Sequence, residues 1–500
     1  MRGIEKLQYF GGLVFAGAIF PLGLAPFNFW PAVPLSIALL FRTLQHKTVK
    51  QTLLNTIAYA FGLFFAGASW LYVSIHEYGF IAAPLALLTT VLFCLFLAFI
   101  FAMPFALSAF IPQTPISWIL ALPSIWVLSE WIRTWFLTGF PWLFAGYSHT
   151  ETWLSGWAPV GGILWLSFLS AFSGILLTLI FQGHIKLSMV RQSAIVMLCI
   201  VVAGYILQQY EWTEKSGKPI SVALIQPNIP QGEKWSKEKQ TAILTQLSAQ
   251  SEVHWDKDLI VWPEMAVPTT PERIPVFMRD LQKRALKTNT SLLSGIVTYD
   301  NETHRYFNSM IALGPSVGQY NKTRLVPFGE YVPFESLLRG LIKFFDLPMS
   351  SIARGEDNQE PFSVQGHLIS AAICYEVVYP DLVARNSIDS SVIMTVSNDT
   401  WFGRSIGPKQ HMQMAQMRAL ENAKPLMRGT NNGISALVDH KGKIYQLAEQ
   451  YQITVLSGIV QPRVGSTVFS KLRSWPIVFI ALFICIALIM TRNQHGEIKT

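Results

Sequence analysis

The chain has 500 residues, of which 51% are hydrophobic and 14% are charged, and its formal net charge is +8. This length is too great for one ordinary domain, and the composition is typical of a protein with membrane-embedded segments. The positive charge does not indicate a nucleic-acid-binding protein. It is spread over short loops and a mixed-charge region, without a basic run or a recognition motif.

Charged residues are distributed unevenly along the chain. Residues 1–210 contain only eight Lys or Arg residues, whereas residues 211–474 have the mixed composition of a globular domain. We therefore predict three parts: a transmembrane domain of seven helices over 1–210, an extramembrane domain over 211–474, and a last transmembrane helix with a tail over 475–500.

Eight apolar segments are predicted to cross a hydrocarbon core of about 30 Å. They are residues 8–25, 30–43, 53–73, 83–110, 115–132, 161–181, 193–210 and 475–491. The first two are short for a full crossing, and the segment 83–110 is long enough that it must tilt or kink at Pro104. The expected membrane part is therefore a multi-span α-helical domain of about eight transmembrane helices.

The short loops between these segments differ in charge. One side of the membrane would carry Arg2, Lys6, Arg42, Lys47, Lys50, Lys186, Arg191, Arg492 and Lys499. The short loops on the opposite side contain only Arg133. Because basic residues remain in the cytoplasm, we expect both termini to be cytoplasmic and the 211–474 domain to lie outside.

The 211–474 region alternates between strand-like and helix-like segments. Apolar runs bounded by turn residues predict strands at 221–226, 258–262, 291–297, 306–313, 317–320, 366–373, 391–396, 433–438 and 455–460. Helices are expected at about 236–252, 273–288 and 408–423. This alternation predicts an α/β sandwich with its helices packed outside the sheets.

One connection is unusually long. Residues 323–362 join two predicted strands, and the part from Leu337 to Met349 is markedly apolar for an exposed loop. Two interpretations remain open: a helix packed on the domain's own core, or an arm that touches the bilayer beside an active site.

Cys374 is the only cysteine of the 211–474 region. The other three, Cys94, Cys199 and Cys485, lie inside predicted membrane spans. Cys374 has no soluble partner for a disulfide, so it is either a buried, inert cysteine or a nucleophile.

Three ionisable residues of different types come at the ends of predicted strands. Glu264 follows the strand 258–262, Lys322 follows 317–320, and Cys374 follows 366–373. Strand ends of an α/β domain meet at one edge of the sheet, where such folds place their sites. A carboxylate can take the thiol proton, and an ammonium can stabilise a thiolate or an oxyanion. The alternative is a surface glutamate, a surface lysine and a core cysteine.

The local motifs resemble those of the nitrilase, or carbon–nitrogen hydrolase, superfamily. Its Glu-Lys-Cys triad occurs in the settings Trp262-Pro-Glu264, Tyr320-Asn-Lys322 and Cys374-Tyr-Glu376, in that chain order. With the membrane spans, the whole chain resembles the membrane-embedded branch of this superfamily, the bacterial apolipoprotein N-acyltransferase family. That resemblance also includes Gly23-Leu-Ala-Pro-Phe-Asn-Phe-Trp-Pro31, Gly139-Phe-Pro-Trp-Leu143, Gln226-Pro-Asn-Ile-Pro-Gln231 and Pro327-Phe-Gly-Glu-Tyr-Val-Pro333.

The resemblance implies an α-β-β-α sandwich in the periplasm, anchored in the bacterial inner membrane and working as a monomer. It also implies transfer of an acyl chain from a phospholipid to the free α-amine of a diacylglyceryl-cysteine on an apolipoprotein. Glu264 would act as base, Cys374 would form a thioester, and Lys322 with the backbone N–H of Tyr375 would stabilise the oxyanion. No metal or other cofactor is expected.

Further residues have two interpretations each. By resemblance Glu330 orients the catalytic lysine or assists proton transfer, but it could be a turn residue beside Gly329. Glu376 could support the site or form an ordinary salt bridge. Trp235 and Phe328 would suit contact with acyl chains or lipid head groups, but aromatic residues are commonly core or interfacial.

Other functions remain possible from the sequence alone. A membrane-tethered amidase or nitrilase would use the same triad with water as the second nucleophile, although such a hydrolase needs no membrane domain. A transporter with an accessory domain is disfavoured because the spans lack paired charges. A non-catalytic lipid receptor is disfavoured by the intact triad.

Overall fold

The computed structural model describes residues 3–183, 187–331 and 352–496. The apolar segment from Leu337 to Met349, expected as a packed helix or a membrane arm, lies outside the described residues. The chain divides into two compact units. The first contains the described parts of 1–76, 81–210 and 472–500, and the second contains 77–80 and 211–471.

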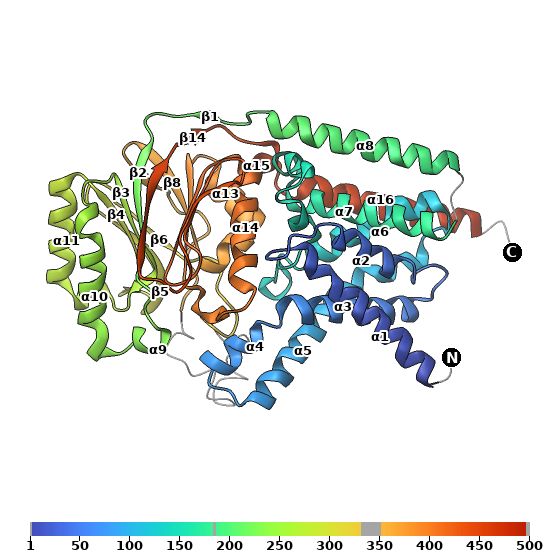
Figure 1. The fold of residues 1–500 in the computed structure, drawn as a ribbon, viewed down its shortest axis with the longest axis horizontal. Helices are drawn as coiled ribbons and strands as arrows, with labels where there is room; N and C mark the ends of the chain where they lie inside the picture. The colour runs from blue at the N-terminus through green and yellow to red at the C-terminus, as the bar shows by residue number, and fades with distance from the viewer. Residues whose placement is uncertain (1–2, 184–186, 332–351, 497–500) are drawn as a thin grey trace. The chain divides into compact units, whose positions relative to one another are not determined.

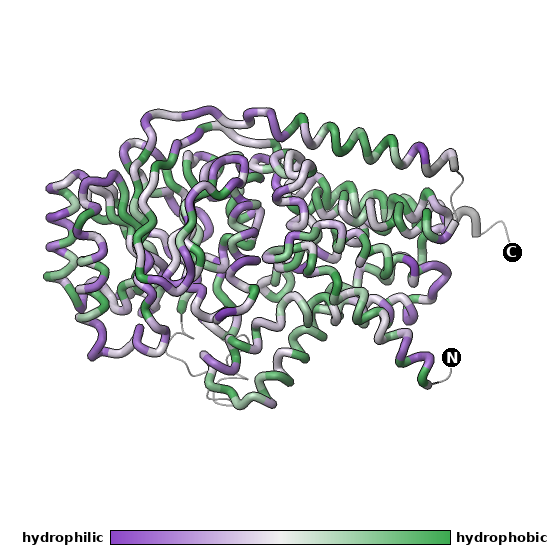
Figure 2. Tube along the Cα trace, in the orientation of Figure 1, coloured by the Kyte–Doolittle hydropathy of each residue, from purple (hydrophilic) through white to green (hydrophobic). Residues whose placement is uncertain are grey.

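The first unit is helical and largely apolar (Figures 1 and 2). Its α-helices are α1 (Gly3–Ile19), α2 (Ala32–Phe41), α3 (Val49–Ala68), α4 (Leu71–Val73), α5 (Ala83–Ala102), α6 (Pro115–Ile132), α7 (Ala158–Phe181), α8 (Leu187–Gln209) and α16 (Trp475–Gly496). A helix in lipid satisfies its own backbone hydrogen bonds, so this architecture fits a membrane protein.

The number of membrane-spanning helices differs from the eight that the sequence predicted. Among the described residues, five helical segments are long and apolar enough to span: Ala83–Phe110, Pro115–Ile132, Trp153–Phe181, Arg191–Gln209 and Trp475–Arg492. Val49–Ala68 with Leu71–Tyr78, bent by 61°, makes a sixth if the pair is one span. The count of eight is therefore not confirmed.

When the bent pair is taken as one span, the two shortest predicted spans account for the difference. Helix α1 has 17 residues and α2 only 10. At 1.5 Å per residue, α2 is about 15 Å long, roughly half of a hydrocarbon core. Most of its side chains are buried, including Val33, Ile37 and Phe41. The apolar run at 30–43 thus reflects burial among neighbouring helices and does not require a complete crossing.

The second unit contains two six-stranded sheets. One sheet has the order β13-β2-β3-β4-β5-β6, with β2 (Ile220–Gln226), β3 (Leu259–Val267), β4 (Ser291–Asp300), β5 (Arg305–Leu313), β6 (Gln319–Asn321) and β13 (Thr454–Val460). The other has the order β12-β11-β10-β9-β8-β7, with β7 (Phe362–Val364), β8 (His367–Ile373), β9 (Val392–Ser397), β10 (Leu426–Thr430), β11 (Ala436–Val438) and β12 (Ile444–Leu447). A short pair, β1 (Glu214–Lys215) and β14 (Arg463–Val464), lies apart from both sheets.

Helices cover the outer face of each sheet (Figure 1). Helices α10 (Lys237–Ser251) and α11 (Pro275–Thr288) lie on the β2–β4 side, and α13 (Pro380–Ser387) and α14 (Gly407–Asn422) lie on the other. The order of layers is helix, sheet, sheet, helix, as the sequence predicted. β8, β9 and β10 are parallel neighbours, so their carboxyl ends lie at one edge of the sheet.

The strand β2 shows why these apolar runs form buried strands. Val222 and Leu224 face the core between the two sheets. The alternate residues Ala223 and Ile225 face the layer that contains α10 and α11. A strand that is covered on both faces needs apolar residues at every position, which explains the continuous run.

Candidate active site

Cys374 begins a tight turn at the end of β8. It is the first residue of the 3₁₀ helix η10 (Cys374–Val378) and has a φ of +53°. This left-handed conformation is unfavourable for a residue with a Cβ, so surrounding contacts must hold it. The Ile373 N–H donates to Glu376 Oε2 at 2.7 Å, and His411 Nε2 lies 3.3 Å from the Cys374 carbonyl oxygen.

Lys322 lies between two carboxylates. Its Nζ is 3.1 Å from Glu264 Oε1 and 3.0 Å from Glu330 Oε1, and all three side chains are buried. Asn308 Nδ2 donates to the same two oxygens at 2.8 Å each. The ammonium and the amide thus fix both carboxylates in one arrangement.

The second oxygen of Glu264 has a separate partner. Glu264 Oε2 accepts a hydrogen bond of 2.9 Å from the backbone N–H of Asn398, which follows β9. Burial alone would raise the pKa of the Glu264 carboxyl, but the charge of Lys322 and the hydrogen bond from Asn308 bring it below its ordinary value. Glu264 is therefore ionised at neutral pH and can accept a proton.

The thiol and the ammonium are affected in opposite ways. Burial and, to a smaller extent, the charge of Glu264 raise the pKa of the Cys374 thiol to about 12, although the charge of Lys322 acts in the opposite direction. Burial would lower the pKa of Lys322, but Glu264 and Glu330 hold it well above its ordinary value. The resting site thus contains a protonated thiol, a permanent cation and a carboxylate that can act as base.

Glu376 connects the loops that carry Lys322 and Cys374. Its Oε1 accepts from the N–H and hydroxyl of Thr323 at 2.6 and 2.7 Å and from the N–H of Arg324 at 3.1 Å. The Tyr320 hydroxyl donates to the same carboxylate at about 3.0 Å. Within the described residues Glu376 forms no ion pair, so the simple salt bridge considered from the sequence is not what this side chain makes.

Comparison with known proteins gives the same domain order over nearly the whole chain. Residues 16–176 match the apolipoprotein N-acyltransferase N-terminal domain, and residues 221–468 match the carbon–nitrogen hydrolase domain. An apolipoprotein N-acyltransferase of Pseudomonas aeruginosa (strain LESB58) is 43% identical over 489 residues, which is 96% of each chain. The chain belongs to the apolipoprotein N-acyltransferase family.

Two further family members extend the comparison. One from Pseudomonas syringae pv. tomato is 41% identical over 495 residues, 97% of each chain, and one from Vibrio vulnificus is 36% identical over 493 residues, 95% of each chain. As a member of this family, the chain is an acyltransferase that contains a carbon–nitrogen hydrolase domain.

The turn that contains Phe328 and Glu330 directs one of these side chains outward and the other inward. The Val326 N–H donates to Glu330 Oε2 at 2.9 Å, which turns the carboxyl group inward towards Lys322. Phe328 has a φ of +64° and a side chain that is 36% exposed. Trp235, which ends α9 (Gln231–Lys234), is similarly exposed at 37%. Neither aromatic residue is therefore a core residue.

Tyr375 follows the nucleophile candidate directly. Its side chain is nearly buried, and its ring meets that of Tyr379 edge-on at 5.3 Å. Its backbone N–H lies one residue after Cys374 at the start of η10, the position from which an amide commonly stabilises an oxyanion.

A buried polar network next to Cys374 was not predicted from the sequence. Ser397 Oγ is 3.3 Å from Cys374 Sγ and 2.7 Å from Asp399 Oδ1. Asp399 also pairs with Arg428 at 2.8 Å and with His411 at 3.1 Å, and all four partners are buried. His411 in α14 is 12 residues from Asp399 and Arg428 in β10 is 29 residues from it, so no short local motif reveals the network.

The candidate site contains a second buried lysine that was not predicted from the sequence. Lys234 Nζ donates to the backbone oxygen of Glu264 at 3.1 Å, and the residue is 2% exposed. Burial lowers its pKa to about 8, although the charges of Glu264 and Cys374 oppose this shift. The sequence signal was weak, because this lysine lies in a polar stretch beside Trp235.

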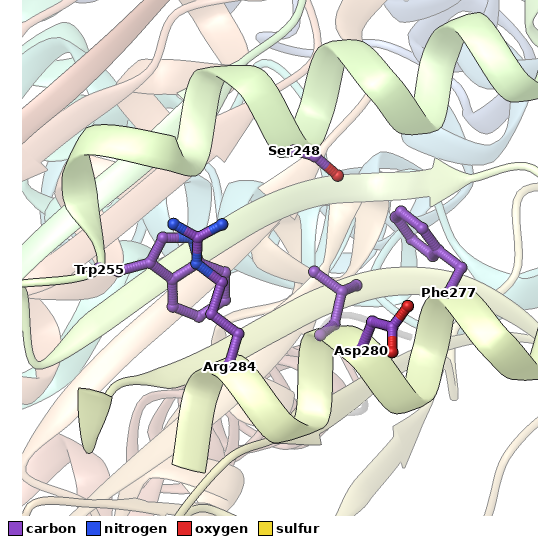
Figure 3. Close-up of a pocket in the computed structure, with 6 residues that line it drawn as sticks. Ser248, Trp255, Phe277, Asp280 and Arg284 are labelled. Atoms are coloured by element: carbon purple, nitrogen blue, oxygen red, sulfur yellow. The ribbon is translucent and has the colours of Figure 1, made fainter. Parts of the chain in front are cut away.

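Two cavities in the catalytic unit lie away from this site. One, of about 170 Å³, is in the outer helix layer between α10 and α11, where the Arg284 guanidinium lies over the Trp255 ring at 5.3 Å (Figure 3). The other, of about 380 Å³, is bordered by residues of β4, β5 and β6. Neither cavity contains Glu264, Lys322 or Cys374 among its lining residues.

Proposed function

We propose that the chain transfers a fatty acyl chain from a membrane phospholipid to the free α-amino group of the diacylglyceryl-cysteine at an apolipoprotein's N-terminus. Family membership gives it apolipoprotein and lipid substrates. The observation that supports this mechanism most is the placement of Lys322 between the Glu264 and Glu330 carboxylates. The charges of Lys322 and Glu264 also act on the Cys374 thiol.

In the first half-reaction, Glu264 takes the proton of the Cys374 thiol, and the thiolate attacks the ester carbonyl carbon of the phospholipid. Lys322 and the backbone N–H of Tyr375 stabilise the oxyanion that forms; removal of one such donor typically costs about 10²–10³ in rate. The tetrahedral intermediate then expels the lysophospholipid alkoxide, which receives the proton from Glu264. The acyl group remains on Cys374 as a thioester.

In the second half-reaction, the neutral α-amine of the apolipoprotein attacks the thioester carbonyl carbon. Glu264 accepts a proton from the amine, and the carbon–sulfur bond breaks as the amide forms. The proton then returns from Glu264 to the Cys374 thiolate. The cycle is ping-pong, because the first product leaves before the second substrate reacts.

Supporting roles follow from the contacts. Glu330 orients Lys322, and Glu376 holds the loop 320–324 against the Cys374 turn. Trp235 and Phe328 have the exposed aromatic surface that acyl chains or lipid head groups require.

We also propose the placement of the chain in the membrane. Residues 1–210 form the transmembrane domain, residues 211–474 form a periplasmic catalytic domain, and residues 475–500 form the last helix and a cytoplasmic tail. In this arrangement all eight apolar segments cross the bacterial inner membrane, the short helix α2 together with the residues that flank it, and both termini are cytoplasmic. The enzyme acts as a monomer among membrane lipids.

The decisive experiment separates the two half-reactions. After incubation with phospholipid alone, the peptide that contains Cys374 should gain the mass of one acyl chain, and Cys374→Ala should abolish transfer to a diacylated lipopeptide. Near-normal transfer by Cys374→Ala, measured on protein that inserts normally into membranes, would refute the mechanism. A membrane-tethered hydrolase would instead release free fatty acid at the same rate with and without the lipopeptide.

A further inference from the structure

Lys234 is a buried ammonium without a carboxylate of its own. It is 2% exposed, and its one hydrogen bond among the described residues goes to a backbone oxygen, that of Glu264 at 3.1 Å. No described residue forms an ion pair with it. Burial of an unpaired ammonium is costly, so such a residue requires a compensating charge nearby or a function that uses its own charge.

The short helix that carries Lys234 is fixed against the reacting groups. Gln231 Oε1 in α9 accepts from Asn398 Nδ2 at 2.8 Å, and the N–H of the same Asn398 donates to Glu264 Oε2. This connection holds the start of α9 beside Glu264. Both Glu264 and Cys374 act electrostatically on Lys234.

Lys234 balances a net negative charge on the neighbouring side chains. Glu264 and Glu330 contribute two negative charges and Lys322 only one positive charge, so these three groups together carry −1. Lys234 brings the group to neutrality. It does so without contacting either carboxylate group, because its hydrogen bond goes to the Glu264 backbone.

The remaining ionisable groups near Cys374 are balanced or solvated separately. Asp399 is paired with Arg428, and burial lowers the pKa of His411, which leaves that imidazole neutral at pH 7. Glu376 accepts hydrogen bonds from backbone N–H groups and hydroxyls, and the charge of Lys322 also acts on it.

We propose that Lys234 is the second cation of the active site, and that its charge allows negative charge to move from Glu264 onto the Cys374 sulfur. The inference rests on the proposed role of Cys374 as nucleophile. When the thiol proton passes to Glu264, the negative charge leaves the carboxylate that Lys322 contacts and appears on sulfur. A cation that acts on both positions stabilises the charge before and after this step.

The same cation serves the second half-reaction. The acceptor α-amine attacks only as the neutral free base, and a site with net negative charge favours the protonated ammonium. Lys234 keeps the site neutral in the acyl-enzyme, where Glu264 has again become a carboxylate. Its loss should therefore slow both half-reactions at neutral pH.

The test uses the full-length enzyme and three variants. Lys234→Met removes the charge and keeps the chain length, and Lys234→Arg keeps the charge. The matched control is Lys424→Met, because Lys424 is also buried, also donates only to backbone oxygens among the described residues, and has a pKa that burial lowers to about 8. Lys424 precedes the amino end of β10, whereas Cys374 follows the carboxyl end of β8. Because β8, β9 and β10 are parallel, the two residues lie at opposite ends of these strands.

The primary measurement is the rate of Cys374 alkylation by iodoacetamide, a small neutral reagent, at pH 7, where Lys234 is charged because its pKa is about 8. The mass of the Cys374 peptide reports the extent of alkylation. Lys234→Met should raise the pKa of the thiol and slow this alkylation about tenfold or more, while Lys234→Arg and Lys424→Met stay near the wild-type rate. Aminolysis of the preformed thioester by a diacylated lipopeptide at the same pH should also be slower in Lys234→Met. An unchanged alkylation rate in Lys234→Met would overturn the proposal, as would an equal loss of rate in Lys234→Arg or in Lys424→Met.

The outcome of this test can be distinguished from a failure of the proposed function. Alkylation reports the environment of the sulfur without any transfer reaction. If Cys374→Ala retained transfer activity, the proposed function would fail, even where Lys234→Met slowed the alkylation of Cys374.

Discussion

Glu376 shows how one buried carboxylate can hold two loops of the candidate site together. It accepts hydrogen bonds from the backbone N–H groups of Thr323, Arg324 and Ile373, which flank Lys322 and Cys374. A glutamine has the same shape but one oxygen fewer, so it would leave some of these donors without an acceptor.

We therefore expect Glu376→Gln to lower both the thermal stability and the transfer rate. Each buried donor left unsatisfied costs about 1–3 kcal/mol, and displacement of Lys322 should reduce transfer by about tenfold or more. The measurement is the Tm in detergent together with lipopeptide acylation. Glu302→Gln, an exposed acid in the β4–β5 turn, serves as the control. Wild-type values for Glu376→Gln would show that the loops are held by other contacts.

Lys424 gives a pH dependence whose sign can be derived. Burial lowers its pKa to about 8, against about 10.4 in an unfolded chain. Between these two values the unfolded chain binds more protons than the folded one, so this group makes the protein more stable as the pH rises from about 8 to about 10.

Replacement of Lys424 by methionine removes this contribution. Between about pH 8 and about pH 10, the Tm of the wild type should therefore rise relative to the Tm of Lys424→Met. The corresponding difference for Lys287→Met, at an exposed position in α11, provides the reference. A difference that stays constant with pH would mean that Lys424 titrates as it does in the unfolded chain.

The strand β3 positions Glu264 through an irregularity in its pairing with β4. The register shifts between Trp262 and Val267, and Met265 has a φ of +46°. On the neighbouring strand, a Cβ added to Gly295 would lie 2.2 Å from the Pro263 oxygen and 2.8 Å from the Glu264 Cα. Gly295 thus allows the backbone that carries Glu264 to approach β4 closely.

We expect Gly295→Ala to displace Glu264 and to reduce acyl transfer by about tenfold or more, because a shift of about 1 Å in a catalytic group is enough for such a loss. Gly429→Ala in β10 is the matched control, since its Cβ would meet nothing closer than 3.6 Å. Initial rates of thioester formation on Cys374 measure the effect. Equal rates in both variants would exclude close β3–β4 packing as the reason for Glu264's position.

The elements predicted best are strands with apolar residues on both faces. The expected strand 366–373 is β8 (His367–Ile373), and 391–396 is β9 (Val392–Ser397), because their sequences are continuous apolar runs. β10 was missed, since Arg428 and Gly429 interrupt its pattern. Arg428 can be buried there only because Asp399, 29 residues earlier in the chain, neutralises it.

The same limit applies to the site. The motifs around Glu264, Lys322 and Cys374 are local, and their expected positions at strand ends predicted that these residues would be close together. Lys322 and Cys374 do follow β6 and β8, but Glu264 lies within β3, which continues past Pro263 through a shifted register. The contacts of Asn308 and Lys234 depend on how distant strands pair, so their side chains look ordinary in the sequence. Local patterns therefore indicate the reacting groups, whereas the residues that balance and orient them require the folded structure.

The whole molecule must combine lipid substrates with polar chemistry. Transfer of an acyl chain into water costs about 0.8 kcal/mol per CH₂, so donor and acceptor lipids remain associated with apolar surface throughout the cycle. This chain has apolar helices in one unit, which can contact lipid chains, and the polar candidate site in the other. The orientation of the chain then determines which lipoproteins can reach Cys374.

The asymmetry of Lys and Arg among the short loops predicts this orientation. We expect a cysteine placed at the exposed position 317, as Val317→Cys, to react with a membrane-impermeant thiol reagent in intact spheroplasts. Gln45→Cys, in the loop between α2 and α3, should react only after permeabilisation. Both substitutions are made in a background without the native cysteines, so that labelling reports one site. Labelling in the reverse order would place residues 211–474 in the cytoplasm and the basic 42–50 loop outside. Exported lipoproteins could then not be the substrates.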